Sequence, residues 1–483
     1  MERPISDMAS VVNEIFTFVR HEAQGMEIGE VERHLFSLVM AVGRAALEEF
    51  LAVKGTGYAG KEIVDAQGNW CPYVRDRSCL YRSIFGPVTV RRAYYYTPGS
   101  PGVFPLDGEL NMPKRGYSYV VQEFSSRLAV MMSYEDAREI LNSFFPVKVP
   151  IRSLESIVGD LCDEVDRFCE EKAPPEVFPD AAVTVATVDK KGIVIRKPNE
   201  DQAGSQALPK NPEKPGKKKM ATVISTYVTR RYFRTADDML RDVSDDGRSD
   251  SKPKPQNKIT WGSLTEAPEK TVARLKKAVD QRLPKGNELV CILDGERSLW
   301  ALVYAYFPVA FFVLDIFHVL EHLGKAALCF YDEGSLQARE FVTERLRMLL
   351  HGKAGRMIGG LKQMLSKHQL SGTEKHCLEQ VIGYLERNRK HMRYEICLAK
   401  GYPIGSGVIE GACRNLINDR LELTGMSWTL QGAESVMRLR AVHINKDWDA
   451  FWTYRRQSER RRLYGIEDSS SSEIRDQELT RAA

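Results

Sequence analysis

Three apolar, β-branched runs of this sequence each lead to an aspartate. AAVTVATVD reaches Asp189, LVCILD reaches Asp294 and FFVLD reaches Asp315. The second and third runs are followed by helical patterns, which are typical of βα units in a sheet covered by helices. Functional residues in such sheets collect at the carboxyl ends of the strands. We therefore expect an α/β fold in which the three aspartates share one sheet edge, with a turn after Asp189 before the chain resumes as IVI.

A fourth carboxylate follows a long helical stretch. Residues 326–399 read as helical throughout, and GYPIGSGVIEGACR then places Glu410 in the first turn of a further helix with Ser406 as N-cap. An acid there can simply complement the helix dipole, assisted by Arg414 four residues later. Glu410 lies one residue beyond the capping-box position, however, so capping does not account for it. If it converges with the aspartates, the oxygen ligands suit Mg²⁺.

Composition restricts the class of protein. The 483 residues suffice for several domains, and no apolar run approaches the roughly 18 residues that cross a bilayer, so we expect a cytoplasmic protein without a membrane partner. The nine cysteines include no C-x2-C pair, which argues against a disulfide framework and against a zinc ribbon. The formal net charge of +4 does not by itself identify a nucleic-acid binder.

The N-terminal third alternates between helical and β-like patterns. Residues 1–52 read as helical, and residues 61–112 read as a small β-rich module with a hairpin around Gly86. From Ser133 the pattern indicates a helix, a short turn and a second helix, with Ser133 and Asp136 as a capping-box signal. A DNA-binding helix-turn-helix and a plain helical hairpin both fit this pattern, because acids on the second helix would repel phosphate.

Arginines cluster near the C-terminus with tyrosines between them. The cluster consists of Arg455, Arg456, Arg460, Arg461 and Arg462. Such a cluster can contact DNA phosphates, and it can equally be the solvated face of an amphipathic helix.

A competing motif lies directly after Asp315. His318, Glu321 and His322 fit H-x-x-E-H, a pattern in which two histidines bind zinc and the glutamate acts as general base. A zinc hydrolase would need a third ligand, for which Glu344 or Glu410 is available. The alternative is an ordinary helix on which His318 lies beside Asp315 in the same cleft as the other acids.

Longer segments resemble one known family. GYPIGSGVIEGACRNLINDRLELTGMSW, LDGERSLW, VLDIFHVLEHL, YLERNRKHMRYE and FGPVTVRRAYYY, spread in order over about residues 80–464, resemble the Kra-type family of bacterial insertion-sequence transposases. These transposases belong to the DDE superfamily, which has a ribonuclease H-like catalytic fold. Two departures stand out: Asp189 is followed by Lys190 and Lys191 where many members have DGKG, and TPGSPG replaces a loop that often carries a cysteine pair.

The resemblance implies a catalytic and metal-binding triad of Asp189, Asp294 and Glu410 and a divalent metal. From the chemistry of the residues we expect two Mg²⁺ or Mn²⁺ ions per site and an auxiliary role for Asp315 and His318, while zinc is doubtful. The expected partners are the terminal repeats of an insertion sequence, target DNA and further copies of the chain in a homodimer or higher homo-oligomer, in the nucleoid of a bacterial cytoplasm. Glycines beside Glu410 would give the DNA backbone room to approach. A catalytically inactive descendant that only binds DNA is the alternative.

The expected architecture is a ribonuclease H-like mixed sheet with a helical insertion, preceded by helical and small β-rich regions. The expected segments are a helical region at 1–60, a β-rich module at 61–115, a helical hairpin at 116–175, a catalytic domain at 176–325 plus 400–450, a helical insertion at 326–399 and a basic, polar tail at 451–483.

Overall fold

The described part of the chain forms two compact units. The structure, a computed structural model, describes residues 8–175, 182–196, 217–244, 253–283, 287–423 and 425–466. The first unit contains the chain up to Glu170 and from Lys446 onward, and the second contains Glu171–Asn445. Two polar stretches of the sequence, residues 197–216 and 245–252, lie outside the described residues.

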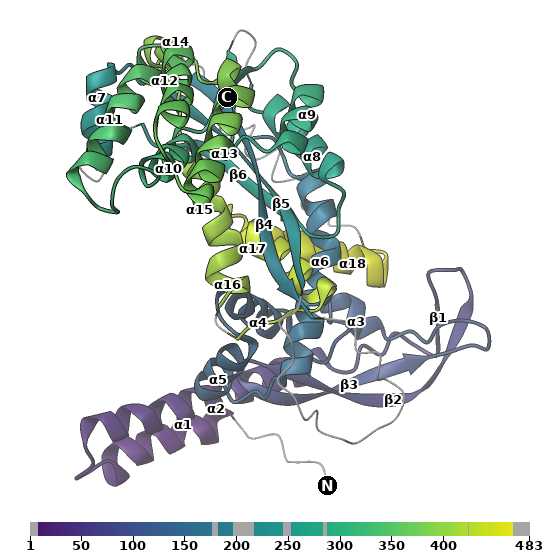
Figure 1. The fold of residues 1–483 in the computed structure, drawn as a ribbon. Helices are drawn as coiled ribbons and strands as arrows, with labels where there is room; N and C mark the ends of the chain where they lie inside the picture. The colour runs from purple at the N-terminus through teal and green to yellow at the C-terminus, as the bar shows by residue number, and fades with distance from the viewer. Residues whose placement is uncertain are drawn as a thin grey trace, which may run out of the picture. The chain divides into compact units, whose positions relative to one another are not determined.

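The first unit combines a small sheet with helices (Figure 1). Its elements are α1 (Met8–Thr17), the π-helical turn η1 (Phe18–Glu22), α2 (Ile28–Lys54), β1 (Glu62–Val64), β2 (Trp70–Ser83), β3 (Gly86–Tyr95), α3 (Pro105–Glu109), α4 (Tyr119–Met131), α5 (Tyr134–Phe144), α6 (Ile151–Glu171) and α18 (Trp448–Tyr464). The strands form an antiparallel sheet in the order β1-β2-β3. The helical and β-rich N-terminal regions and the hairpin at Gly86 are thus confirmed.

The C-terminal segment differs from the expected tail. Residues 448–464 form α18, and Phe451 and Trp452 of this helix are buried in the first unit. Because the segment is rich in arginine, the sequence indicated a polar tail. Phe451 and Trp452 nevertheless supply the apolar face with which the helix packs on the first unit. Residues 467–483 lie outside the described part of the chain.

The second unit contains a five-stranded sheet and a series of helices. Its elements are β4 (Ala182–Ile195), β5 (Lys217–Arg230), α7 (Ala236–Ser244), β6 (Gln256–Ser263), α8 (Pro268–Asp280), β7 (Glu288–Leu293), α9 (Arg297–Tyr306), β8 (Phe311–Leu314), α10 (Ile316–Ala327), α11 (Leu336–Leu350), α12 (Ala354–Lys367), α13 (Gly372–Asn388), the 3₁₀ turn η2 (Arg389–His391), α14 (Tyr394–Lys400), α15 (Gly407–Cys413), the π-helical turn η3 (Arg414–Asn418), α16 (Asp419–Leu421) and α17 (Leu430–Ile444).

The topology of this sheet confirms the expected fold class. The strand order is β6-β5-β4-β7-β8. β5 runs antiparallel to both of its neighbours, whereas β7 runs parallel to β4 and to β8. This mixed arrangement, in which the second strand along the chain is reversed, is that of a ribonuclease H-like sheet. The stretch between β8 and α15 is helical, as the sequence indicates.

The turn expected after Asp189 is absent from the described chain. β4 continues through Asp189 to Ile195, because β5 supplies a Cα partner for every residue of this extension, from Asp189↔Val223 to Ile195↔Lys217. The lysines that follow Asp189 therefore belong to a paired strand. The polar pair Lys190 and Lys191 looked like a turn in the sequence, but the pairing with β5 overrides that local signal.

Helices cover the sheet on both sides. α8 packs on β4, β5 and β6, whereas α15 packs on β4 and β5 and α17 packs on β6; Figure 1 shows α8 and α17 on opposite sides of the sheet. Helices α10 to α13 pack against one another in sequence order. Within the described residues, none of the helices has the length and apolar character that spanning a bilayer requires.

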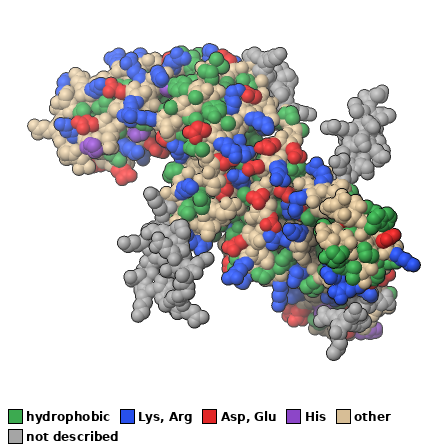
Figure 2. Space-filling model, turned by 90° about the vertical axis from the view of Figure 1, so that its right-hand side faces the viewer, with side chains coloured by type: hydrophobic (Ala, Val, Ile, Leu, Met, Phe, Trp, Pro, Cys, Tyr) green, Lys and Arg blue, Asp and Glu red, His purple; other side chains and the backbone are tan. Residues whose placement is uncertain are grey.

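The surface carries mixed charge. On the face drawn in Figure 2, Lys and Arg side chains are interspersed with Asp and Glu side chains. This mixture agrees with the low formal net charge of +4. A DNA-binding surface therefore has to be argued from particular side chains and not from total charge.

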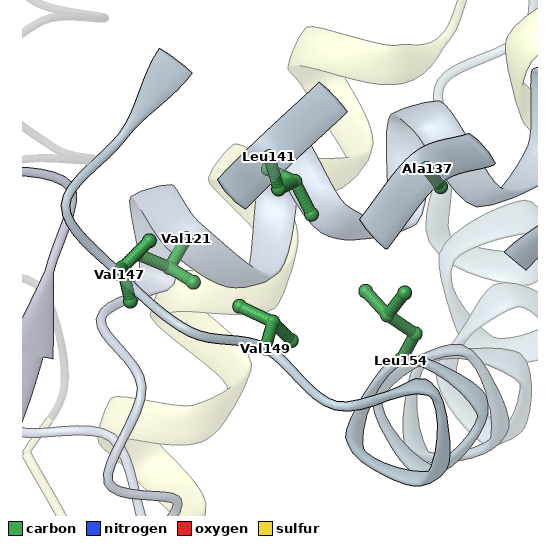
Figure 3. Packing of buried hydrophobic residues seen from close by; sticks show 6 residues of the cluster. All are labelled: Val121, Ala137, Leu141, Val147, Val149 and Leu154. Atoms are coloured by element: carbon green, nitrogen blue, oxygen red, sulfur yellow. The ribbon is translucent and has the colours of Figure 1, made fainter. Parts of the chain in front are cut away.

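The core of the helical hairpin in the first unit forms where α4, α5 and α6 meet (Figure 3). The Ser133 side chain accepts a hydrogen bond from the Asp136 amide and caps α5, as the capping signal predicts. α5 then buries Ala137 and Leu141, and α6 buries Leu154 against them. The cluster consists of Val121, Ala137, Leu141, Val147, Val149 and Leu154.

Truncation of Leu154 to alanine should destabilise this hairpin. Leu154 is fully buried, so Leu154→Ala should lower the free energy of unfolding by about 2–5 kcal/mol through lost transfer energy and a residual cavity. Urea unfolding followed by circular dichroism measures the change. The matched control is Val53→Ala on α2, where the side chain is 79% exposed and the change should stay within about 0.5 kcal/mol. Equal effects of both substitutions would contradict the assigned core.

Candidate active site

Three aspartates lie in one row at the carboxyl edge of the second unit's sheet. Thr187 of β4 pairs with Ile292 of β7, and Ile292 pairs with Val313 of β8. Two residues further along each chain, the same row holds Asp189, Asp294 and Asp315. Because side chains alternate along strands, residues two positions beyond a paired row point to the same face. Asp189 thus lies within β4, whereas Asp294 and Asp315 directly follow the ends of β7 and β8.

Asp189 and Asp294 influence each other electrostatically. Burial raises the pKa of Asp294 above its ordinary value, and the neighbouring Asp189 carboxylate raises it further. Asp294 Oδ1 accepts the backbone amide of Glu296 at 2.9 Å, and Asp189 Oδ1 accepts that of Lys190 at 2.6 Å. The two carboxylates therefore lie close enough to repel one another and are each oriented by the backbone.

Asp315 has a different environment because its carboxylate is fully buried and surrounded by donors. Oδ1 accepts the amides of Phe317 at 3.2 Å and Ser406 at 2.9 Å. Oδ2 accepts the Ser406 hydroxyl at 2.6 Å and His318 Nδ1 at 2.7 Å. These bonds cap α10 and fasten the segment that precedes α15. Asp315 thus acts as a structural anchor of the site.

His318 carries a positive charge at neutral pH. The hydrogen bond to Asp315 raises the pKa of His318 to about 9, and the charges of Asp315 and Asp294 act in the same direction. Ligand atoms of Asp315, His318 and Glu410 lie within 4.8 Å of one another, a spacing that could suit a metal ion. Within this cluster His318 Nδ1 pairs with Asp315 Oδ2 at 2.7 Å. The cluster contains Glu410 of the predicted triad but neither Asp189 nor Asp294.

Glu410 reaches the cluster from the first turn of α15. Its Oε1 accepts the Ser406 hydroxyl at 3.3 Å, while the nearby Arg414 pairs with Asp419 at 3.6 Å. Partial burial raises the pKa of Glu410, the charge of Asp315 adds to this shift and His318 opposes it. Ser406 is the N-cap residue as expected, but its side chain binds Asp315 instead of an amide of the helix.

The glycines around Glu410 have two different surroundings. A Cβ at Gly405 would lie 2.6 Å from the Phe317 ring, so this glycine permits close packing of α10. A Cβ at Gly407 or Gly411 would meet no atom of the described chain within 4 Å. The space expected beside Glu410 is therefore at Gly407 and Gly411.

Two contacts that the sequence did not reveal involve the two aspartates of the predicted triad, Asp189 and Asp294. The Cys413 thiol of α15 donates to Asp189 Oδ2 at 3.4 Å. Tyr384 of α13 donates to the Asp294 backbone carbonyl at 2.6 Å, and a Cβ at Gly295 would lie 2.8 Å from the Tyr384 ring. The glycine at 295 is a signal in the sequence, because both its φ of +98° and the nearby Tyr384 ring favour glycine there, whereas Cys413 gives no such signal.

Lys190 forms a further link across the edge of the sheet. Its Nζ donates to Glu296 Oε1 at 2.7 Å and to the Ser298 hydroxyl at 2.8 Å. Lys190, which stands where many family members have the first glycine of DGKG, thus forms an ion pair with Glu296, two residues beyond Asp294.

The zinc motif is not assembled by the fold. The His322 ring stacks on Tyr384 with centroids 3.7 Å apart, and burial lowers the pKa of His322 to about 4. Among the described residues, the cluster with metal-compatible spacing contains neither His322 nor Glu321. The ordinary-helix interpretation of this segment therefore fits the geometry better.

The arginine cluster lies on α18 in the first unit and divides into two kinds of side chain. Arg455 is buried and forms ion pairs with Glu164 and, at 3.3 Å, with Glu459. Arg456, Arg461 and Arg462 are exposed, and Arg460 is partly buried. Glu459 also pairs with Arg462, and Glu123 lies 3.9 Å from Arg456. Arg455 thus stabilises the first unit and is not available to DNA in this fold.

Comparisons with known proteins add little to this description. Neither protein-family models nor curated proteins gave a match to this chain. Among solved structures, the chain is similar to a chain of the Drosophila P element transposase strand transfer complex, with 10% sequence identity and a TM-score of 0.25 over 72% of this chain and 84% of that chain. A similarity at that level carries no argument about function, which has to be inferred from the site itself.

Replacing Asp315 by asparagine should lower the pKa of His318 from about 9 towards its ordinary value near 6.5, because the main stabilising partner of the imidazolium is lost. Histidine NMR titration measures this change, with His318→Gln to assign the signal. Asp332→Asn, at an exposed acid, is the control. Since the folded pKa lies above the unfolded one, the contribution of His318 to stability should be complete below about pH 6.5 and disappear as pH rises through about 9. An unchanged titration in Asp315→Asn would contradict the assigned contact.

Proposed function

We propose that the chain is a metal-dependent DNA transposase of the Kra type, which cleaves insertion-sequence ends and joins them to target DNA. The observation that carries this proposal is the group of acids on a ribonuclease H-like sheet: Asp189 lies on β4, Asp294 directly follows the adjacent parallel strand β7, and the charge of Asp189 acts on Asp294. α15 carries Glu410 beside Asp315 and His318, and the same helix contacts Asp189 through Cys413. This combination of strand-borne and helix-borne acids is the one expected of a DDE site.

The donor set fits a hard divalent cation. Asp189 raises the pKa of Asp294, and a cation bound between two such carboxylates would relieve their repulsion. Asp315 already accepts four hydrogen bonds from the protein, one of them from His318 Nδ1, so we assign Asp315 and His318 to positioning and not to metal binding. Asp189, Asp294 and Glu410 are therefore the proposed ligands of Mg²⁺ or Mn²⁺, as two ions. When bound, such ions would activate the attacking oxygen and stabilise the leaving oxygen.

The proposed reaction consists of two displacements at phosphorus. Water attacks a phosphodiester at the element end, the bond from phosphorus to the 3′-oxygen breaks, and a 3′-hydroxyl is released. That hydroxyl then attacks a phosphodiester of the target and displaces its 3′-oxygen. His318 keeps a positive charge beside Glu410 and Asp294, which reduces repulsion within the acidic group and towards DNA phosphate.

DNA contact is proposed for the exposed arginines of α18 and not for Arg455. Arg456, Arg461 and Arg462 of α18 are exposed, and Arg462 also pairs with Glu459 at 2.5 Å. Their role would be to hold phosphates of the terminal repeats or the target. Because two element ends must be handled together, we propose that the working form is a homodimer or higher homo-oligomer.

Substitution of the helix-borne acid tests the activity. Glu410→Gln should reduce strand cleavage and joining by at least about 100-fold, because even partners that only orient metal ligands are typically worth 10–100-fold. The assay uses DNA carrying the terminal sequences of the element with Mg²⁺ or Mn²⁺. The matched control is Glu333→Gln, at an exposed acid between α10 and α11, which should retain activity.

Full activity of Glu410→Gln would show that Glu410 does not belong to the active site. A wild-type protein that binds the DNA but nicks it with neither metal would be the inactive descendant instead.

The exposed arginines can be tested through the salt dependence of DNA binding. Arg461→Ala should weaken binding and reduce the slope of log K against log salt by about 1, because one phosphate contact is lost. Filter binding over a range of salt concentrations measures the slope. Arg91→Ala on β3, where the side chain is 62% exposed, is the matched control and should leave the slope unchanged. An identical slope for wild type and Arg461→Ala would exclude the proposed contact.

A further inference from the structure

The contact between Cys413 and Asp189 connects the proposed first acid with the helix that carries the third. Cys413 is the last residue of α15, and its side chain is 5% exposed. Its thiol lies 3.4 Å from Asp189 Oδ2. A carboxylate can only accept a hydrogen bond, so the thiol is the donor. The contact joins residues that are 224 positions apart in the chain.

Glu410 and Cys413 share one face of α15. Residues three apart on a helix are neighbours on its surface, and α15 packs on β4 and β5. Glu410 is the exposed member of the pair, while Cys413 is buried against the strand that holds Asp189. Directly after Cys413 the helix widens into the π-helical turn η3, a feature that is frequent at functional sites.

Asp189 is held through both carboxylate oxygens. Oδ1 accepts the Lys190 amide at 2.6 Å, and Oδ2 accepts the Cys413 thiol. The amide belongs to the neighbouring residue and restrains the carboxylate only locally. The thiol, in contrast, belongs to α15, so its loss would leave Asp189 Oδ2 without a hydrogen bond to that helix.

We propose that Cys413 is a positioning residue whose thiol orients the Asp189 carboxylate relative to Glu410, so that a single helix sets the geometry of both acids. This inference rests on the proposed function, because it assumes that Asp189 and Glu410 bind the same cations. α15 is itself fixed at its start by the bonds between Ser406 and Asp315. A displacement of α15 therefore moves Glu410 and releases Asp189 together.

Metal affinity of the full-length protein tests the proposal without any DNA. Cys413→Ala should weaken Mn²⁺ binding about fivefold, which corresponds to a net hydrogen bond of roughly 1 kcal/mol at ~1.4 kcal/mol per tenfold. Cys413→Ser keeps a donor of similar size and should bind Mn²⁺ within about twofold of wild type. Free Mn²⁺ is measured by electron paramagnetic resonance during titration.

Two further variants distinguish a failure of the positioning role from a failure of the proposed metal site. Cys397→Ala removes another fully buried thiol of the same unit and should leave Mn²⁺ affinity unchanged, so it accounts for a general loss of packing. Asp189→Asn removes a proposed ligand. If Asp189→Asn weakens binding but Cys413→Ala does not, or if Cys413→Ser binds as weakly as Cys413→Ala, the positioning role is wrong while the metal site stands. If Asp189→Asn has no effect, the proposed metal site fails and the positioning role fails with it.

An infrared measurement on metal-free protein provides an independent readout. The S–H stretching band of Cys413, isolated as the difference between wild type and Cys413→Ala, should lie at the low frequency of a thiol bonded to a carboxylate. In Asp189→Asn it should shift to higher frequency, because a neutral amide oxygen is a weaker acceptor. A band that is the same in both backgrounds would overturn the proposal.

Discussion

The buried carboxylate of Asp315 connects the parts of the candidate site. It is fully buried, and an isolated charge in such a place would be costly unless donors surround it. The amides of Phe317 and Ser406, the Ser406 hydroxyl and His318 meet this requirement. The strand β8, the helix α10 and the start of α15 are thereby joined at one point. Because α15 carries Glu410, the position of the helix-borne acid depends on an aspartate 95 residues earlier that need not bind metal itself.

The charges of the site balance in a way that suits a cation. Asp189 lies on β4 and Asp294 directly follows the parallel strand β7; burial raises the pKa of Asp294, and the charge of Asp189 raises it further. The pKa of His318 is raised to about 9 by its bond to Asp315, and its charge acts on both Asp294 and Glu410. The acids are thus held together by backbone amides, a thiol and one imidazolium. A divalent ion would complete this balance, as the proposed phosphoryl transfer requires.

The first unit shows why a cluster of like residues need not act as a group. Arg455 points into the interior, where Glu164 and Glu459 neutralise it, and the aromatic residues Phe451 and Trp452 dock the same helix. Arg456, Arg461 and Arg462 on the same helix are exposed, although Arg462 pairs with Glu459. Helical periodicity therefore divides one basic stretch into a structural part and a part able to meet phosphate.

The sequence by itself indicated the apolar strands that lead to Asp189, Asp294 and Asp315 and the helix in whose first turn Glu410 lies, because these features depend on local periodicity and on helix-start signals. It did not reveal that β4 runs on past Asp189, since that extension depends on pairing with β5, whose partner residues are encoded elsewhere. Nor could it assign Asp315 to an anchoring role or bring Cys413 to Asp189, because both depend on contacts between residues far apart in the chain. Only the tertiary structure decided which acids remain open to a ligand and which are already satisfied by the protein, because that depends on the donors surrounding each carboxylate.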